Sequence, residues 1–180
     1  MRIAVTGGSG FLGQATVRAA ETAGHDVWSF DRSEGHDVLG DLSALSGADV
    51  VIHLAGVLGT SELFDDPVTA VNVNVTGSLR IFDLSLRLAC RVVHSSSNVV
   101  YGTPTPYRTS KLAAEMYAAD YNTLYDGNII CLRYSNVIGP RLRRGDPVAV
   151  AVPQKLVVPG DLVVVDPEAP PGAVFVHAAA

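Results

Sequence analysis

The chain has 180 residues, a length that fits one domain with a sizeable buried core. Hydrophobic residues make up 48% of it and charged residues 17%, which excludes a disordered chain and indicates a globular protein. The net charge of −5, without a basic stripe, gives no expectation of nucleic-acid binding. The chain shows no signal-peptide pattern and no apolar run long enough to span a bilayer, so we expect a cytoplasmic protein without a membrane partner. Cys90 and Cys131 lack metal-ligand spacing, and we expect them to be small buried hydrophobic residues.

The first expected strand, Arg2–Thr6, runs directly into three glycines that precede a helical pattern. Apolar residues recur at helical spacing from Phe11 onward. Gly7, Gly10 and Gly13 would let a pyrophosphate approach the backbone, and free amides at the start of the helix would favour its charge. Glycines in this position, after a strand and before a helix, predict a dinucleotide-binding site.

The second expected strand, Val27–Phe30, ends at Asp31. A carboxylate at this position can accept hydrogen bonds from both hydroxyl groups of an adenosine ribose, and it would repel a 2′-phosphate. Asp31 therefore favours NAD over NADP. Arg32 keeps NADP open, because a cation there could partly accommodate the phosphate. A purely structural role for Asp31, capping the next turn, is the alternative.

Three more strands are expected to alternate with two long helices. Near-continuous apolar strands that alternate with helices imply a parallel sheet covered on both faces. The predicted fold class is therefore α/β, a doubly wound parallel sheet of the Rossmann type. The further strands are expected at Asp49–Leu54, Arg91–Ser95 and Ile129–Arg133, and the helices at Pro67–Leu88 and Tyr107–Tyr125.

The second long helix carries a tyrosine and a lysine at helical spacing. Tyr107 and Lys111 are four residues apart, so their side chains share one face, about 6 Å apart along the axis. A free tyrosine has a pKa of about 10, and a nearby ammonium together with a positive nicotinamide ring favours the phenolate. The pair therefore predicts proton transfer beside a nicotinamide cofactor. The serines Ser95-Ser96-Ser97 end the preceding strand region and would supply further hydroxyl groups.

The composition changes after Gly145. Six of the ten prolines lie between Pro147 and Pro171, and no lysine or arginine follows Lys155. Val157-Val158 and Leu162–Val165 could form short strands, each bounded by proline. We therefore expect a cofactor-binding domain over residues 1–145 and a proline-rich segment over residues 146–180.

The spacing Gly7-x-x-Gly10-x-x-Gly13 after a threonine resembles that of the extended short-chain dehydrogenase/reductase family. Within it, the chain is most similar to NAD-dependent epimerases and dehydratases of the UDP-glucose/galactose 4-epimerase type. The resemblance covers residues 1 to about 145. Members of the family continue into a C-terminal substrate lobe. Ala173–His177 resembles the start of a later strand motif, so the resemblance implies that most of that lobe is missing and that residues 146–180 are its remnant.

The resemblance also implies which residues bind NAD. His53-Leu-Ala-Gly56 is similar to the motif beside the adenine and its ribose, although His53 itself is expected to be a hydrogen-bonded structural histidine. Asp37-Val38 is similar to the acidic–apolar pair that contacts adenine, with Asp41-Leu42 as a competing alignment. Asn74-Val-Thr-Gly77 is similar to an asparagine motif in a helix. The expected NAD-binding residues are Gly7, Gly10, Phe11, Leu12, Gly13, Asp31, Arg32, Asp37, Val38, Leu54, Ala55, Gly56, Asn74, Ser95, Tyr107, Lys111 and Tyr134.

The catalytic residues implied by the resemblance are Ser97, Tyr107 and Lys111. Tyr107 would take a hydroxyl proton from a nucleotide sugar, Ser97 would hold the same oxygen, and Lys111 would lower the phenol pKa. Ser97 and Asn136 would contact the substrate. One departure is the short connection from Ser97 to Tyr107, which contains prolines and would reduce the lip of the substrate pocket.

The expected function is therefore an NAD-dependent epimerase or dehydratase of a nucleotide sugar. Two alternatives stay open: an NAD(P)-dependent reductase of a small carbonyl compound, and a cofactor-binding module without turnover. Similar family members form a homodimer through their long helices. In this chain the apolar contacts would come from Leu79, Phe82, Leu86 and Met116.

Overall fold

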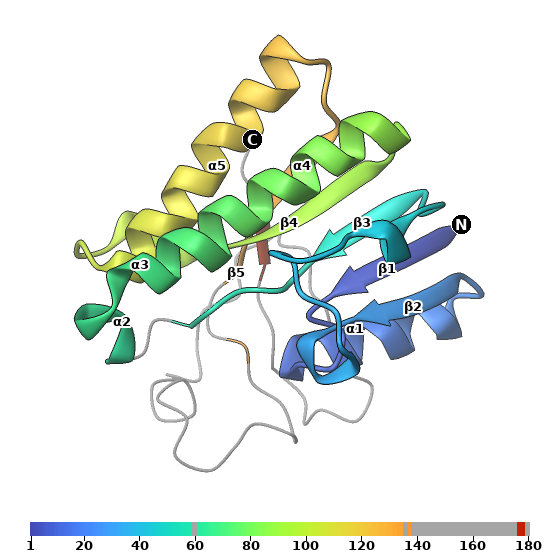
Figure 1. Cartoon of the computed structure of the whole chain (residues 1–180), viewed down its shortest axis with the longest axis horizontal. Helices are drawn as coiled ribbons and strands as arrows, with labels where there is room; N and C mark the ends of the chain where they lie inside the picture. Colours follow the sequence, from blue (N-terminus) through green and yellow to red (C-terminus); the bar gives the residue numbers. More distant parts are fainter. Residues whose placement is uncertain (59–60, 135–136, 138–175, 179–180) are drawn as a thin grey trace.

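The computed structural model describes residues 1–58, 61–134, 137 and 176–178. Its strands are β1 (Arg2–Thr6), β2 (Asp26–Phe30), β3 (Val50–His53), β4 (Arg91–Ser97), β5 (Ile129–Tyr134) and β6 (Val176–Ala178). Within these residues they form one sheet in the order β2-β1-β3-β4-β5-β6 (Figure 1). The pairs from β2 to β5 are parallel, whereas β6 runs antiparallel to β5. The predicted parallel α/β sheet is confirmed, with a short antiparallel strand added at its edge.

Local sequence signals explain where the helices begin. The helices are α1 (Phe11–Thr22), α2 (Glu62–Asp65), α3 (Pro67–Ala70), α4 (Gly77–Leu88) and α5 (Pro106–Leu124). Asp66 and Thr105 cap α3 and α5, accepting hydrogen bonds from the amides of Thr69 and Arg108 at 3.2 and 3.0 Å. A proline follows each cap as the first helical residue, where its missing N–H leaves no bond unmade.

The predicted helix Pro67–Leu88 is present but not uniform. A π-helical segment, Val71–Thr76, joins α3 to α4. Such a widened turn changes the direction of side chains on its inner face and is often found at functional sites. It places Asn74 inside the protein, where only 1% of its surface is exposed.

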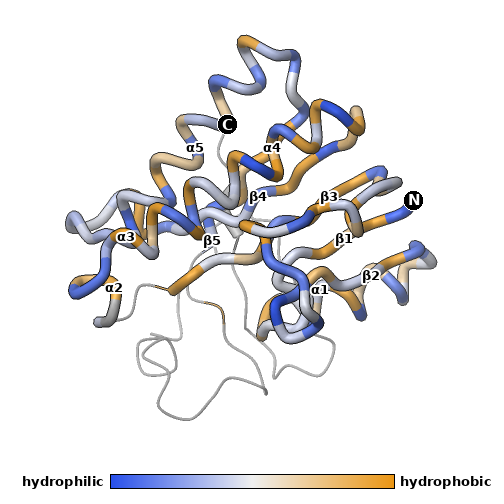
Figure 2. The backbone as a smooth tube through the Cα atoms, viewed as in Figure 1, coloured by the Kyte–Doolittle hydropathy of each residue, from blue (hydrophilic) through white to orange (hydrophobic). Residues whose placement is uncertain are grey.

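The main core lies between the sheet and the helices α4 and α5. Figure 1 shows these two helices side by side, with α1 lying apart from them along β1 and β2. Because side chains alternate along a strand, Val92 of β4 packs into this core, while Val93 joins a smaller cluster with Leu132 on the other face. Figure 2 shows hydrophobic and hydrophilic stretches alternating along α4, which is typical of a helix with one face on the core.

Two residues predicted to face a partner chain contact this core, and one of them, Phe82, is fully inside it. Phe82 is fully buried, with its ring centroid 5.6 Å from that of His94, and Leu79 packs against the same cluster. The prediction for Phe82 is wrong, because α4 turns this face toward its own sheet. Leu86 is half-buried, and Met116 is 64% exposed.

The parallel strands deliver the predicted site residues to one edge of the sheet. β1 ends before the glycine segment, β2 before Asp31, and β4 at Ser97. In the order β2-β1-β3, the chain goes from β1 to β2 on one side and then crosses over to β3 on the other side of β1, and this reversal opens a crevice at the carboxyl ends of the strands. Ligands of doubly wound sheets bind in such a crevice.

Most of the C-terminal segment lies outside the described residues. The possible strands Val157-Val158 and Leu162–Val165 and the predicted domain boundary at residue 145 are among the positions not covered. β6 covers the end of the motif predicted at Ala173–His177. Among the helices of the described part, none is both long and apolar enough to cross a membrane.

Candidate active site

The glycine segment makes a close turn between β1 and α1. Gly7 has a positive φ of 72°, and a Cβ added to it would lie 2.8 Å from the amide nitrogen of Ala55. A Cβ on Gly13 would lie 2.7 Å from the Cα of Gly8. Gly10 is the cap residue of α1 and gives it no side-chain hydrogen bond. The turn therefore leaves a helix N-terminus beside a backbone without side chains, which suits a pyrophosphate.

Asp31 sits where β2 ends, beside the glycine segment. One carboxylate oxygen accepts hydrogen bonds from the amide and hydroxyl of Ser33 at 2.9 and 2.8 Å, and the other accepts from the amide of Ser9 at 3.2 Å. Burial raises the pKa of Asp31, but the hydrogen bonds from Ser33 and Ser9 outweigh it and hold this pKa below its usual value. The carboxylate is charged at neutral pH. Asp31 therefore caps the turn that follows β2. To bind a ribose, its oxygens would exchange the hydrogen bonds from Ser33 and Ser9 for bonds from the ribose hydroxyl groups.

In this structure the Arg32 side chain is paired with Asp37 and does not favour the binding of a 2′-phosphate. Its Nε atom lies 3.4 Å from a carboxylate oxygen of Asp37, and the two side chains are 79% and 42% exposed. So exposed an ion pair contributes little to stability. The pair does, however, occupy the Arg32 guanidinium, which is the positive charge that would favour NADP.

The predicted adenine contact, Asp37-Val38, is divided between surface and core. Val38 is 5% exposed and packs beneath α4, where a Cβ on Gly77 would lie 2.8 Å from its side chain. In the competing alignment, Asp41 accepts hydrogen bonds from the amide and hydroxyl of Ser43, at 2.9 and 2.6 Å. Neither pair is thereby assigned to adenine.

Asn74 ties the loop after β3 to the π-helical segment and to α5. Its Oδ1 atom accepts from the amide of Val57 at 2.8 Å, and its Nδ2 atom donates to the carbonyl of Val57 and the hydroxyl of Ser110, at 3.2 and 3.0 Å. A Cβ on Gly56 would lie 2.9 Å from Asn74 Oδ1 and 3.4 Å from Lys111 Nζ. The predicted residues of three separate elements therefore meet here. Ser110 was not predicted, although it lies next to Lys111.

His53 is a hydrogen-bonded structural histidine, as expected. Ser78 donates to the carbonyl of Asn74 at 2.6 Å, so it accepts from His53 Nε2 at 3.1 Å, and His53 Nδ1 accepts from the hydroxyl of Thr6 at 2.7 Å. Burial lowers the pKa of His53 to about 3. The neutral imidazole links β1, β3 and α4 beneath the glycine turn.

Ser97, Tyr107 and Lys111 meet at the carboxyl end of β4. Lys111 is 5% exposed and donates from Nζ to the carbonyl of Ser95 at 2.9 Å. Burial lowers the pKa of Lys111 to about 8. Its Nζ atom lies 5.8 Å from the centroid of the Tyr107 ring, and the Ser97 side chain is near enough to the Tyr107 hydroxyl to lower the pKa of Tyr107. The structure thus brings together the three residues predicted to be catalytic.

The expected effect of Lys111 on Tyr107 is not met in the protein alone. Burial raises the pKa of Tyr107, and the hydrogen bond with Ser97 lowers it only in part. The physical reason is that the ammonium group is directed to the carbonyl of Ser95. A phenolate here would need a further positive charge nearby.

Tyr134 ends β5 and packs with Leu12 and Leu54, two other predicted cofactor residues. It is 8% exposed, and burial raises its pKa to about 12. Asn136, the predicted substrate contact, lies outside the described residues. Across the described part of the chain, no group of three His, Cys, Asp or Glu side chains is placed to hold a metal ion.

Sequence reasoning missed an ion pair behind this site. Arg133 of β5 and Glu115 of α5 lie 2.6 Å apart, with side chains only 20% and 9% exposed. No local spacing signals this pair, since the residue one helical turn before Glu115 is Lys111, which donates to the carbonyl of Ser95 instead. Arg133 is a charged residue within a strand that pairs on both sides, a position that requires a partner.

Comparison with known proteins places the chain in a family. The model of the NAD-dependent epimerase/dehydratase family matches residues 3–156. The chain belongs to this family. A UDP-glucose 4-epimerase from Mycolicibacterium smegmatis is 32% identical over 78% of this chain and 58% of that protein. A GDP-6-deoxy-D-mannose reductase from Pseudomonas aeruginosa is 32% identical over 85% of this chain and 58% of its own length.

Solved structures of epimerases show the same fold. A UDP-galactose 4-epimerase superposes with a TM-score of 0.73 at 29% identity, over 81% of this chain and 59% of that chain. The UDP-glucose 4-epimerase of Thermus thermophilus, solved in complex with NAD, superposes with a TM-score of 0.75 at 26% identity, over 83% and 60%. The chain therefore spans about three fifths of the length of these relatives. NAD, the predicted cofactor, is the cofactor of the family.

Proposed function

We propose that this chain binds NAD and supplies the cofactor-binding half and the proton-transfer residues of a nucleotide-sugar epimerase or dehydratase. The observation that carries the proposal is the meeting of two sites at one edge of the sheet. The glycine turn and Asp31 lie at the ends of β1 and β2, and the contact of Ser97 with Tyr107 lies at the end of β4. The residues fit the cofactor, because a Cβ on Gly7 or Gly13 would fill the space that the backbone turn leaves.

Each residue has a role that its surroundings support. The amides at the start of α1 would bind the pyrophosphate, and Asp31 would accept the ribose hydroxyl groups. Bound NAD would accept a hydride from the sugar and return it. Tyr107 would take the proton of the reacting hydroxyl group, and Ser97 would hold the same oxygen by a hydrogen bond. Lys111, fixed by the carbonyl of Ser95, would keep a positive charge beside the phenol.

The nucleotide-sugar substrate is proposed from the relatives. The M. smegmatis relative is a UDP-glucose 4-epimerase. A related crystal structure is that of MoeE5, which holds UDP-glucose and NAD. Because this chain covers about three fifths of such proteins, contacts to the nucleotide would come largely from residues that it does not contain. We expect this chain by itself to bind NAD and to turn over sugar weakly.

A reductase is the second candidate function. The similarity to a GDP-6-deoxy-D-mannose reductase favours it, since that relative is as identical to this chain as the M. smegmatis epimerase. A reductase and an epimerase differ in what happens to the hydride. A reductase changes the absorbance of the reduced cofactor in proportion to product, whereas an epimerase returns the hydride and leaves that absorbance unchanged.

Two measurements test the proposal. Mass spectrometry of the purified chain and calorimetry with NAD and NADP should show NAD binding and a preference for NAD. Incubation with a panel of nucleotide sugars, followed by product analysis, should show any epimerisation or dehydration. A chain that is folded by circular dichroism but binds neither cofactor contradicts the proposal.

The assembly, the domain limits and the location belong to the same proposal. We propose a homodimer in which Leu86 and the exposed Met116 contact a partner chain, and light scattering at high micromolar concentration would detect it. Residues 1–145 would form the cofactor-binding domain, and residues 146–180 would belong to the substrate lobe. A cytoplasmic location would be tested by fractionation of the source cells.

A further inference from the structure

The loop between β4 and α5 joins two of the proposed catalytic residues. Ser97 is the last residue of β4, and Tyr107 is the second residue of α5. Between them the chain makes a short 3₁₀ turn, Asn98–Tyr101, and then reaches Thr105, the cap of α5. The position of this loop therefore sets how the Ser97 hydroxyl meets the Tyr107 phenol.

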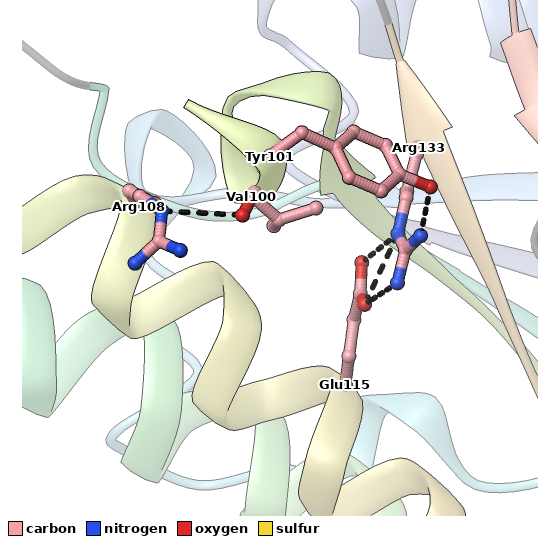
Figure 3. Close-up of polar contacts among 5 residues, drawn as sticks. All are labelled: Val100, Tyr101, Arg108, Glu115 and Arg133. Carbon is pink, nitrogen blue, oxygen red and sulfur yellow. Dashed lines mark hydrogen bonds and ion pairs between the residues drawn. The ribbon is translucent and has the colours of Figure 1, made fainter. Parts of the chain in front are cut away.

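A half-buried ion pair lies next to this loop. Figure 3 shows Arg133 of β5 facing Glu115 of α5. Arg133 Nε donates to both carboxylate oxygens of Glu115, at 2.9 and 3.1 Å, and Nη2 donates to one of them at 2.6 Å. Several charge-assisted hydrogen bonds fix the guanidinium plane, which a single point contact would not do.

The fixed guanidinium group in turn holds Tyr101. Arg133 Nη1 donates to the Tyr101 hydroxyl, and the guanidinium carbon lies 4.7 Å from the centroid of the Tyr101 ring. Tyr101 is 72% exposed, so burial does not hold its ring in place. The hydrogen bond and the cation–π contact with Arg133 are what fix this ring, the last residue of the 3₁₀ turn.

A second arginine holds the same turn from α5. Arg108 Nε donates to the carbonyl of Val100 at 3.1 Å (Figure 3). The amide of Arg108 also donates to the Thr105 hydroxyl at 3.0 Å. Arg108 is the neighbour of Tyr107 in the chain. The turn is thus connected to the tyrosine-bearing helix at Val100 and to β5 at Tyr101.

We infer that Tyr101, Arg133 and Glu115 are positioning residues, which hold the Asn98–Tyr101 turn so that its cap residue Ser97 keeps its side chain within reach of the Tyr107 hydroxyl. This inference rests on the proposed function, since the contact matters for the roles proposed for these two residues. Arg133 and Glu115 act through Tyr101 and the turn, and Tyr101 acts through Ser97. Tyr107 is faced by Lys111 from its own helix and by Ser97 from β4.

The test measures the ionisation of residue 107 without NAD. Difluorotyrosine is incorporated at position 107 of the full chain, because fluorine brings phenol ionisation close to neutral pH, and its ¹⁹F resonance is followed against pH. Ser97→Ala should raise this pKa by about one unit, the size expected for a hydrogen bond to a charged group. Tyr101→Phe, which removes one exposed hydroxyl group, should raise it in the same direction by a smaller amount. Glu115→Gln should act like Tyr101→Phe, and Tyr117→Phe on the exposed side of α5 should leave the pKa unchanged.

A double-mutant cycle separates positioning from a direct effect. In the Ser97→Ala background, Tyr101→Phe should cause no further shift, because the contact that it positions is already absent. The inference is overturned if Tyr101→Phe and Glu115→Gln leave the pKa unchanged, or if the Tyr101→Phe shift persists in that background. Failure of the proposed function is a different result, the absence of cofactor binding in calorimetry, and it does not affect this titration.

Discussion

Replacement of Gly7 by alanine tests whether the turn after β1 requires glycine for two separate reasons. The positive φ of 72° costs a residue with a Cβ about 1–2 kcal/mol. The new Cβ would also lie 2.8 Å from the nitrogen and 3.0 Å from the Cα of Ala55, and backbone that must shift adds about 1–3 kcal/mol. We therefore expect Gly7→Ala to lower the free energy of unfolding by about 2–5 kcal/mol.

Gly24→Ala is the matched control. Gly24 has a φ of 81°, but a Cβ there would meet nothing within 4 Å. Gly24→Ala should therefore lower the free energy of unfolding only through the positive φ, by about 1–2 kcal/mol. In a chain of this size each kcal/mol lowers Tm by about 2–4 °C, so the two variants should be separable by thermal unfolding followed by circular dichroism.

The same two variants should differ in cofactor binding. Gly7→Ala moves the backbone that would face the pyrophosphate, and calorimetry should show about tenfold weaker NAD binding or worse. Gly24→Ala lies at the far end of α1 and should bind NAD normally. Equal losses of stability in the two variants, or unchanged NAD affinity in Gly7→Ala, would refute the reasoning.

Substitutions of charged and titratable residues test the rest of the site. Asp31→Asn should weaken NAD binding and narrow the preference over NADP in calorimetry, because it removes the charge that repels a 2′-phosphate; an unchanged ratio would contradict this. Tyr107→Phe should bind NAD nearly as the parent chain does and lose any sugar turnover in product assays, and equal turnover would remove Tyr107 from the mechanism. Burial lowers the pKa of His53 to about 3 and also lowers the pKa of His94, so stability should fall as pH drops below about 6.5, by about 1.4 kcal/mol per pH unit for each histidine that is still neutral in the folded protein. Among the described residues neither ring nitrogen of His94 has a hydrogen-bond partner, so the His94→Met variant should be as stable as the parent chain at pH 7 and less sensitive to acid in urea unfolding. The His53→Met variant loses two hydrogen bonds and should be less stable than the parent chain both at pH 7 and at acidic pH.

The local pattern of the chain predicts the fold class, and it proposes many residues of the candidate site. Glycine spacing between a strand and a helix, and a tyrosine and lysine one helical turn apart, are determined by neighbours in sequence. Apolar runs also located the five parallel strands to within two residues at each end. In a parallel sheet the strand ends share one edge, so the predicted parallel sheet puts Asp31, Ser97 and the glycine turn along one edge, whereas the strand order comes from the structure.

Contacts between distant positions were decided only by the tertiary structure. Arg133 and Glu115 are 18 positions apart and Arg133 and Tyr101 are 32 apart, and nothing local pairs them. Phe82 was predicted to face a partner chain, but the direction in which α4 packs buries it against the sheet. The pKa of Tyr107 was also decided here, since burial and the direction of the Lys111 ammonium are properties of the packed site. Sequence periodicity determines which residues share a face, but the surroundings of that face, and hence its burial and electrostatics, are set by chain segments far away in sequence.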